Sequence, residues 1–215
     1  MAFVIDGTTG IATVDGSVSA PSQRGQDTNT GISYAADTIK FSTNGVERMS
    51  ITNSGVVGAG GGKILQVVST TKTDHFSTTS SSLTEVTGLN VTITPSASTS
   101  KIYLNIDVSL GGSTAYTAFN IKRDSTLIAV TTAVDGNDSR HQGTFGKVIV
   151  QDSGIHSTGF NFLDTPGDTN AHTYKIFVIS TYGSRTVNIN RSHNTANAAY
   201  DFAGCSTITA MEVAA

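Results

Sequence analysis

The most constraining feature of this sequence is a ten-residue stretch, Lys101 to Leu110, in which two sets of side chains alternate without exception. Successive side chains of a β-strand point to opposite faces of its sheet, so a period of two predicts a strand with one buried face and one wet face. The wet set contains Lys101, Tyr103, Asn105, Asp107 and Ser109. The set that we expect in a core contains Ile102, Leu104, Ile106, Val108 and Leu110.

Further strand-like segments run from residue 63 to the end of the chain. They are ILQVVSTT, LTEVTGLNVTIT, AFNIKRDSTLIAV, FGKVIVQD, TGFNFLD, HTYKIFVIS, RTVNIN and STITAMEVA. In HTYKIFVIS both sets of side chains are largely apolar, which predicts a strand covered on both sides. About nine or ten short strands without a convincing helix predict an all-β fold, an antiparallel β-sandwich or jelly roll. The charged segment GVERMSI keeps the same alternation and is interpreted as strand or turn.

The N-terminal part of the chain has a different character, and the change falls near the glycine run Gly60–Gly62. We therefore predict an extended, β-rich N-terminal segment over residues 1–62 and a distal domain over residues 63–215. The pairs Asp6-Gly7, Asp15-Gly16 and Asn44-Gly45 predict tight hairpins or strand breaks. Large apolar residues are too few here to offset backbone ordering of roughly 1–2 kcal/mol per residue. We expect this segment to fold only against copies of itself.

Charge and targeting signals narrow the function classes. Charged residues make up 13% of the chain and the formal net charge is −3, so a basic footprint for nucleic acid is absent and we expect no nucleic-acid partner. The start MAFVIDGTTG does not resemble a signal peptide, and no segment has the length of a membrane span, so we expect no membrane insertion. The single cysteine, Cys205, cannot form an intrachain disulfide and is expected to be a buried, inert thiol. Oligomerisation is the expected source of stability.

Several separated stretches resemble parts of known virion proteins. DTNTGISYAADTIKFSTNGVERMSITNSGVV resembles a segment found repeatedly in tail-fibre and related structural proteins of tailed bacteriophages, especially those of marine and cyanobacterial hosts. The stretch beginning KILQVVSTTKTDHF, together with GFNFLDTPGDTNAHTYKIFV and the terminal STITAMEVAA, is similar to C-terminal fibre-tip domains. These motifs occur in the expected order, and the resemblance covers most of the chain.

The resemblance implies a trimeric fibre on the virion. Its N-terminal part would attach to other virion proteins or extend the fibre, and its C-terminal jelly-roll head would meet a glycan or protein of the host surface. A capsid-decorating or head-fibre protein of the same fold is the alternative, because a short trimer of this kind could also sit on a capsid. A glycan-degrading tailspike-type enzyme is the third hypothesis.

Catalytic and metal motifs are not evident in the sequence, so we expect adhesion rather than enzymatic activity, with no cofactor and no metal site. The five histidines are dispersed and show no zinc-site spacing. The acidic loop AVDGNDSRHQG lacks the terminal glutamate of a calcium loop and is interpreted as a hairpin tip. In LDTPGDTN, Pro166-Gly167 predicts a type II turn, and we interpret the flanking Asp164 and Asp168 as structural.

Receptor contact would require aromatic faces and hydrogen-bonding groups in loops, because these suit neutral sugar rings. Tryptophan is absent from the chain, which leaves tyrosine as the stacking residue we expect. The loop-like candidates for receptor binding are Tyr116, Arg140, His141, Tyr182, Arg185, Arg191, His193, Asn194 and Tyr200.

Overall fold

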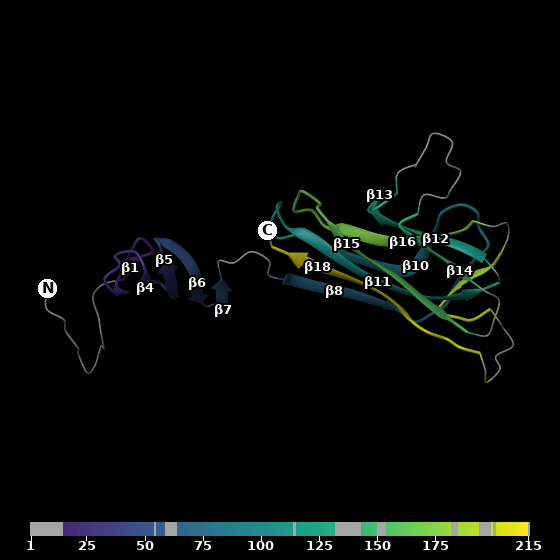
Figure 1. The fold of residues 1–215 in the computed structure, drawn as a ribbon, viewed down its shortest axis with the longest axis horizontal. Coiled ribbons are helices and arrows are strands. Elements are labelled where there is room, and N and C mark those ends of the chain that lie inside the picture. The colour runs from purple at the N-terminus through teal and green to yellow at the C-terminus, as the bar shows by residue number, and fades with distance from the viewer. Residues whose placement is uncertain are drawn as a thin grey trace. The chain divides into compact units, whose positions relative to one another are not determined.

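The computed structural model describes residues 15–53, 55–58, 64–113, 115–131, 143–149, 154–181, 185–193, 199 and 201–214. The chain divides into two compact units, Met1–Gly61 and Gly62–Ala215 (Figure 1). All regular structure in the described residues is β-strand, in antiparallel sheets, as the sequence predicted. Within this described part of the chain, no helix has the length and apolar character needed to cross a membrane.

The N-terminal unit, unit 1, is built on a five-stranded antiparallel meander. The small pair β1 (Gly16–Ser17) and β2 (Ala20–Pro21) precedes it. The meander contains β3 (Gln23–Arg24), β4 (Gly31–Ala35), β5 (Thr38–Thr43), β6 (Val46–Thr52) and β7 (Gly55–Gly58). GVERMSI is therefore strand. At the predicted turn between β5 and β6, Asn44 and Gly45 both have positive φ, 51° and 70°, as a tight hairpin of this type requires.

The two faces of the unit 1 meander differ sharply in chemistry. Strand pairing aligns Tyr34, Ile39, Ile51 and Val56 in one cross-strand row and Ile32, Phe41 and Met49 in the next. We call this the apolar face of unit 1. Its large side chains are all half-buried or exposed, whereas the buried residues of the described meander strands are Ser33, Ser42 and Ser50. The described part of unit 1 thus buries no large apolar side chain.

Unit 2 is a sandwich of two antiparallel sheets. One sheet contains β8 (Ile64–Lys72), β18 (Ser206–Val213), β11 (Lys101–Gly112) and β15 (His156–Asp164), with β17 (Val187–Ile189) and β9 (Phe76–Thr78) continuing it. The other contains β10 (Thr84–Ile93), β16 (His172–Ser180), β12 (Ala115–Arg123), β13 (Thr126–Ile128) and β14 (Phe145–Ile149).

The pairing of unit 2 strands identifies the sandwich as a jelly roll. Its strands pair from the outside of the chain inward: β8 with β18, β10 with β16, β11 with β15 and β12 with β14. A chain folded in this nested way behaves as one long hairpin rolled into two sheets, which is the jelly-roll arrangement. Bonds between β11 and β18 and between β12 and β16 complete the two sheets.

The core lies between these sheets, and the predicted alternation of β11 is confirmed. Its five predicted core residues are at most 2% exposed. They face apolar side chains of the second sheet: Val86, Leu89, Val91, Ile93, Phe119, Ile121, Tyr174, Ile176 and Val178. A row of stacked rings, Phe119, Phe145, Phe160 and Phe162, lies where β12 and β14 approach β15, with successive centroids 4.8, 6.0 and 6.4 Å apart.

The sequence predicted that the strand HTYKIFVIS is covered on both sides and that Cys205 is buried. Strand β16 is covered on its inner face, and on the other face Ile179 is buried, as predicted, whereas Phe177 is half-buried, with the Lys122 ammonium 4.4 Å from its ring centroid. The prediction that Cys205 is buried was wrong, because Cys205 is exposed. It immediately precedes Ser206, which points inward at the start of β18, and the alternation turns Cys205 outward.

Candidate functional site

The two ends of the jelly roll differ in which segments they carry. At one end, the entry end, β8 begins and β18 ends, and the turns 124–125 and 165–171 lie nearby. At the other, the distal end, lie residues 113, 181, 185–186, 190–193 and 201–205, which follow or precede the opposite ends of the same strands. The sandwich therefore separates the point where the chain enters from the longer connections.

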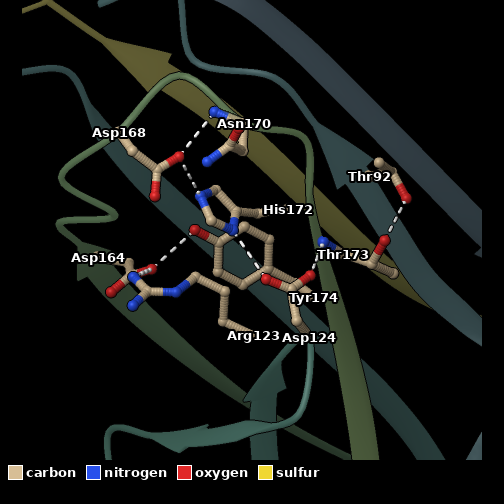
Figure 2. A network of polar contacts seen from close by, with 9 residues as sticks. All are labelled: Thr92, Arg123, Asp124, Asp164, Asp168, Asn170, His172, Thr173 and Tyr174. Carbon is tan, nitrogen blue, oxygen red and sulfur yellow. Dashed lines mark hydrogen bonds and ion pairs between the residues drawn. The ribbon is translucent and has the colours of Figure 1, made fainter. Parts of the chain in front are cut away.

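The entry end is closed by a network of polar side chains from the turns 124–125 and 165–171 and from the strand ends beside them (Figure 2). Its first part is a buried triad. The Asp164 carboxylate accepts hydrogen bonds of 2.7 Å from both Arg123 and the hydroxyl of Tyr174. Tyr174 is fully buried, and burial together with the adjacent carboxylate raises the pKa of its hydroxyl, which stays protonated and donates. The triad joins the ends of β12, β15 and β16.

The second part of the network is a histidine held between two carboxylates. The two ring nitrogens of His172 lie 2.8 Å from Asp124 and 3.1 Å from Asp168. Asp168 also accepts the Asn170 backbone N–H at 2.6 Å, and this bond, followed by His172, lowers the pKa of the Asp168 carboxyl. Both ring nitrogens form hydrogen bonds, so His172 links the turn that carries Asp124 to the turn that carries Asp168. The predicted turn at Pro166-Gly167 is consistent with Gly167, whose φ is +85°.

A third contact at the entry end fixes the loop between β10 and β11. The Glu212 carboxylate, 1% exposed, accepts the backbone N–H and the hydroxyl of Ser96, both at 2.6 Å, and the Gln66 amide at 3.2 Å. Burial opposes ionisation, but these hydrogen bonds outweigh it and lower the pKa of Glu212. The polar side chains of this network thus find their hydrogen-bond partners within the fold. Across the described residues, no group of three or more His, Cys, Asp or Glu side chains could hold a metal ion.

The distal end contains the predicted receptor-binding residues that the structure describes. Tyr116 and Arg185 are exposed, whereas Arg191 and His193 are half-buried. Hydrogen bonds between Ser113 and the backbone of Thr186 tie the segment carrying Arg185 to the end of β11. Another candidate, Tyr116, accepts two hydrogen bonds from Thr181 at its backbone oxygen. The remaining candidates, Arg140, His141, Tyr182, Asn194 and Tyr200, lie outside the described residues, as does the loop AVDGNDSRHQG in large part.

Polar groups at the distal end are less completely paired than those at the entry end. The hydroxyls of Thr117, Ser180 and Ser192 and the Asn188 side-chain oxygen are buried and have no hydrogen-bond partner within the described part of the chain. Buried polar atoms without a partner are uncommon in folded proteins and each one costs stability. Because these four atoms are buried, their missing hydrogen bonds lower stability and are not available to a ligand at the surface.

Comparison with known proteins places the chain outside any family model. No protein-family model and no curated protein sequence matches it. Its matches among solved structures include three of infectious bursal disease virus. The structure of the Gx strain is 11% identical, covers 96% of this chain and 58% of its own, and has a TM-score of 0.37. The VP2 subviral particle is 12% identical, with coverages of 94% and 55% and a TM-score of 0.33. The Gt strain is 12% identical, with coverages of 94% and 56% and a TM-score of 0.31. The chain spans less than two thirds of the length of each of these proteins, and all three TM-scores are low.

One exposed aromatic residue at the distal end was missed in the sequence. Phe202 is 59% exposed and lies beside the segment of Arg191, since its carbonyl accepts the Ser192 backbone N–H. We expected tyrosine alone to provide stacking surfaces, and Phe202 lies close before the strand STITAMEV, where an apolar residue is ordinarily assigned to the core. Its position between Asp201 and Gly204, two residue types common in loops, was the available signal.

The carboxylates of the entry end predict how stability depends on pH. Partial burial opposes ionisation of Asp124, but hydrogen bonds from the Thr173 N–H and His172 outweigh it and lower the pKa of Asp124. A carboxyl whose pKa is lower in the folded state stabilises the fold above its unfolded pKa, near 3.8, and this contribution disappears as the pH falls through the folded pKa. We expect Asp124→Asn to cost about 1 kcal/mol at pH 7, because the carboxylate is half-exposed, and to cost progressively less below pH ~4. Urea unfolding of both forms across pH 2–7 measures this; a difference that stays constant with pH would contradict it.

Proposed function

We propose that this chain is a subunit of a virion fibre, acting as a tail fibre or receptor-binding tip that adheres to a glycan or protein of the host surface. The observation that carries the proposal is the asymmetry of the jelly roll. The end where the chain enters is closed by internal polar contacts, whereas the opposite end carries the exposed side chains of Tyr116, Arg185 and Phe202. A head attached at one end and chemically open at the other suits a fibre tip.

The chemistry of the distal end suits a sugar better than a charged polymer. Aromatic rings bind the apolar faces of sugar rings, and hydroxyl, amide and guanidinium groups bind their hydroxyls. Adhesion of this kind requires no turnover, and in this proposal the chain is not an enzyme. Affinity at each site is modest and is raised by several equivalent sites on one particle.

Assembly into a homotrimer is part of the same proposal, and the apolar face of unit 1 supports it. A small sheet that buries only serines among its described meander strands lacks the apolar burial that independent stability requires. Charged Lys40 and Glu47, which pair at 3.4 Å, belong to neighbouring strands, and the aligned rows of the apolar face contain no charged residue. Copies of this face packed together would provide the missing core, while the N-terminal end of the fibre binds other virion proteins.

The binding proposal predicts a loss of adhesion when the distal aromatic residues are removed. The double variant Tyr116→Ala, Phe202→Ala is expected to bind an array of bacterial surface oligosaccharides, or intact host cells, at least about tenfold more weakly than the unmodified chain, since each ring contributes on the order of 1 kcal/mol. Leu127→Ala is the matched control, because Leu127 is also exposed but lies in the hairpin at the entry end. Equal binding by all three proteins would contradict the proposed tip.

The two alternatives predict other outcomes of the same measurement. A capsid-decorating protein would bind genome-filled or empty capsids and neither oligosaccharides nor cells. A glycan-degrading enzyme would release new reducing ends from the oligosaccharides it binds. Binding to cells without release of sugar is the result expected of the adhesive fibre.

A further inference from the structure

The outer face of the jelly roll carries an uncharged row of side chains that crosses a whole sheet. Strand pairing aligns Leu163 of β15 with Tyr103 of β11, Tyr103 with Met211 of β18, and Met211 with Val67 of β8. Val67 and Leu163, at the two ends of this row, are 57% and 47% exposed. Ile64 and Leu65, at the start of β8, are also exposed, and Ile64 pairs with Val213, two residues beyond Met211 on β18. We call these six residues the apolar band.

The next row toward the distal end is entirely polar and is paired within the sheet. It aligns Asn161, Asn105, Thr209 and Ser69. The amides of Asn105 and Asn161 are joined by a hydrogen bond of 2.8 Å, and the hydroxyls of Ser69 and Thr209 by another of 2.8 Å. The face thus changes from apolar to self-paired polar within two residues along each strand. Water solvates the second row well, whereas the apolar band gains free energy only when another surface covers it.

We propose that the apolar band is a contact surface for a second copy of this chain, formed around the axis of the fibre at the entry end of the head. This inference rests on the homo-oligomeric assembly proposed above and adds where the heads of neighbouring copies touch. It places the apolar band, at the entry end of the outer face of the β15-β11-β18-β8 sheet, inside the assembly, and it leaves the polar row and the distal end free.

The absence of charge within the band favours an apolar partner over a charged one. Lys101, which pairs with Val213 beside the band, is the charged residue at its margin, and its long side chain can keep its ammonium in water. A single cation does not provide the footprint that an anionic polymer needs. A matching uncharged surface, such as the same band on another copy, fulfils the requirement.

Continuity along the chain identifies that partner as another copy. The band begins at Ile64, and β7, which carries Val56 of the apolar face of unit 1, ends at Gly58, so five residues of sequence separate the two surfaces. When copies assemble through unit 1, their bands are therefore tethered at high effective concentration. At such an effective concentration, even a contact of about six residues per copy forms in most assemblies.

A pair of substitutions on β8 tests the band directly. Val67→Asp places a charge in the band, and Ser69→Asp places the same charge on the same strand and face, one polar row away. In the full chain, we expect Val67→Asp to raise the concentration at which the oligomer dissociates by at least about tenfold, measured by light scattering on dilution. Ser69→Asp should change it by less than about twofold. Leu163→Asp and Asn161→Asp form a second such pair on β15, and thermal unfolding checks that every variant is folded.

The outcomes separate this inference from the proposed function. If Val67→Asp and Leu163→Asp leave an oligomeric chain as stable as their polar-row controls do, the band is not a contact between copies, and the assembly through unit 1 is unaffected. If the unmodified chain is a monomer at every concentration, the assembly fails and the inference fails with it. Dissociation by the two band variants alone is the result that supports the inference.

Discussion

Removal of the Asp164 carboxylate is expected to lower the unfolding free energy of the jelly roll by about 3–5 kcal/mol. Asp164→Ala leaves the fully buried Tyr174 hydroxyl without its acceptor and leaves Arg123, whose side chain is 21% exposed, without its counter-charge. Breaking a buried ion pair from one side is costly because the remaining charge stays in a poorly solvated site. Urea unfolding of the full chain at neutral pH, followed by tyrosine fluorescence, measures the change.

The matched control for this variant lies on β10, in the sheet that carries Arg123 and Tyr174. Glu85 forms an ion pair of 3.3 Å with Lys175 of β16, but both side chains are about one third exposed. Solvent screens such a pair, so Glu85→Ala is expected to cost about 1 kcal/mol or less. Asp164→Asn keeps an acceptor for Tyr174 and should fall between the two. A loss from Asp164→Ala no greater than that from Glu85→Ala would contradict the role assigned to the buried triad.

A charge placed on the apolar face of unit 1 is expected to dissociate the assembly. Val56 and Val57 are neighbours on the edge strand β7 and point to opposite faces of the sheet. Val56→Asp brings like charges together at the contact between copies, and we expect it to raise the dissociation concentration at least about 100-fold. Light scattering over a dilution series of the full chain measures this.

The neighbouring substitution controls for everything except the face. Val57→Asp introduces the same residue, with the same loss of β-propensity, on the face where Ser50 is its cross-strand partner. It should leave the dissociation concentration within about threefold of that of the unmodified chain. Equal effects from the two variants would mean that strand stability, and not burial of the apolar face, governs the assembly.

Strands in both units could be predicted because each depends on its own local pattern. The alternation from Lys101 to Leu110 determines which side of β11 is buried, and Asn44-Gly45 supplies the positive φ that its hairpin requires. GVERMSI, despite its charges, is strand because the alternation outweighs its composition. Patterns of this kind are read within one segment, without knowledge of its neighbours.

The entry-end network and the apolar band could not be predicted, because both are made by pairing between distant segments. Asp164 and Arg123 are 41 residues apart, and Glu212 and Ser96 are 116 apart. Leu163 and Val67 share a row only because β11 and β18 lie between them in a particular register. Cys205 was assigned to the core for a related reason: its apolar surroundings in sequence do not reveal which face of the strand start it takes.

The solution mass of the unmodified full chain tests the central claim most directly. Light scattering coupled to size-exclusion chromatography is expected to give three times the chain mass of 22.3 kDa, because both the apolar face of unit 1 and the apolar band require cover from other copies. A mass of 22.3 kDa that persists at every concentration accessible to the measurement would contradict the account of this chain as a subunit of a trimeric fibre.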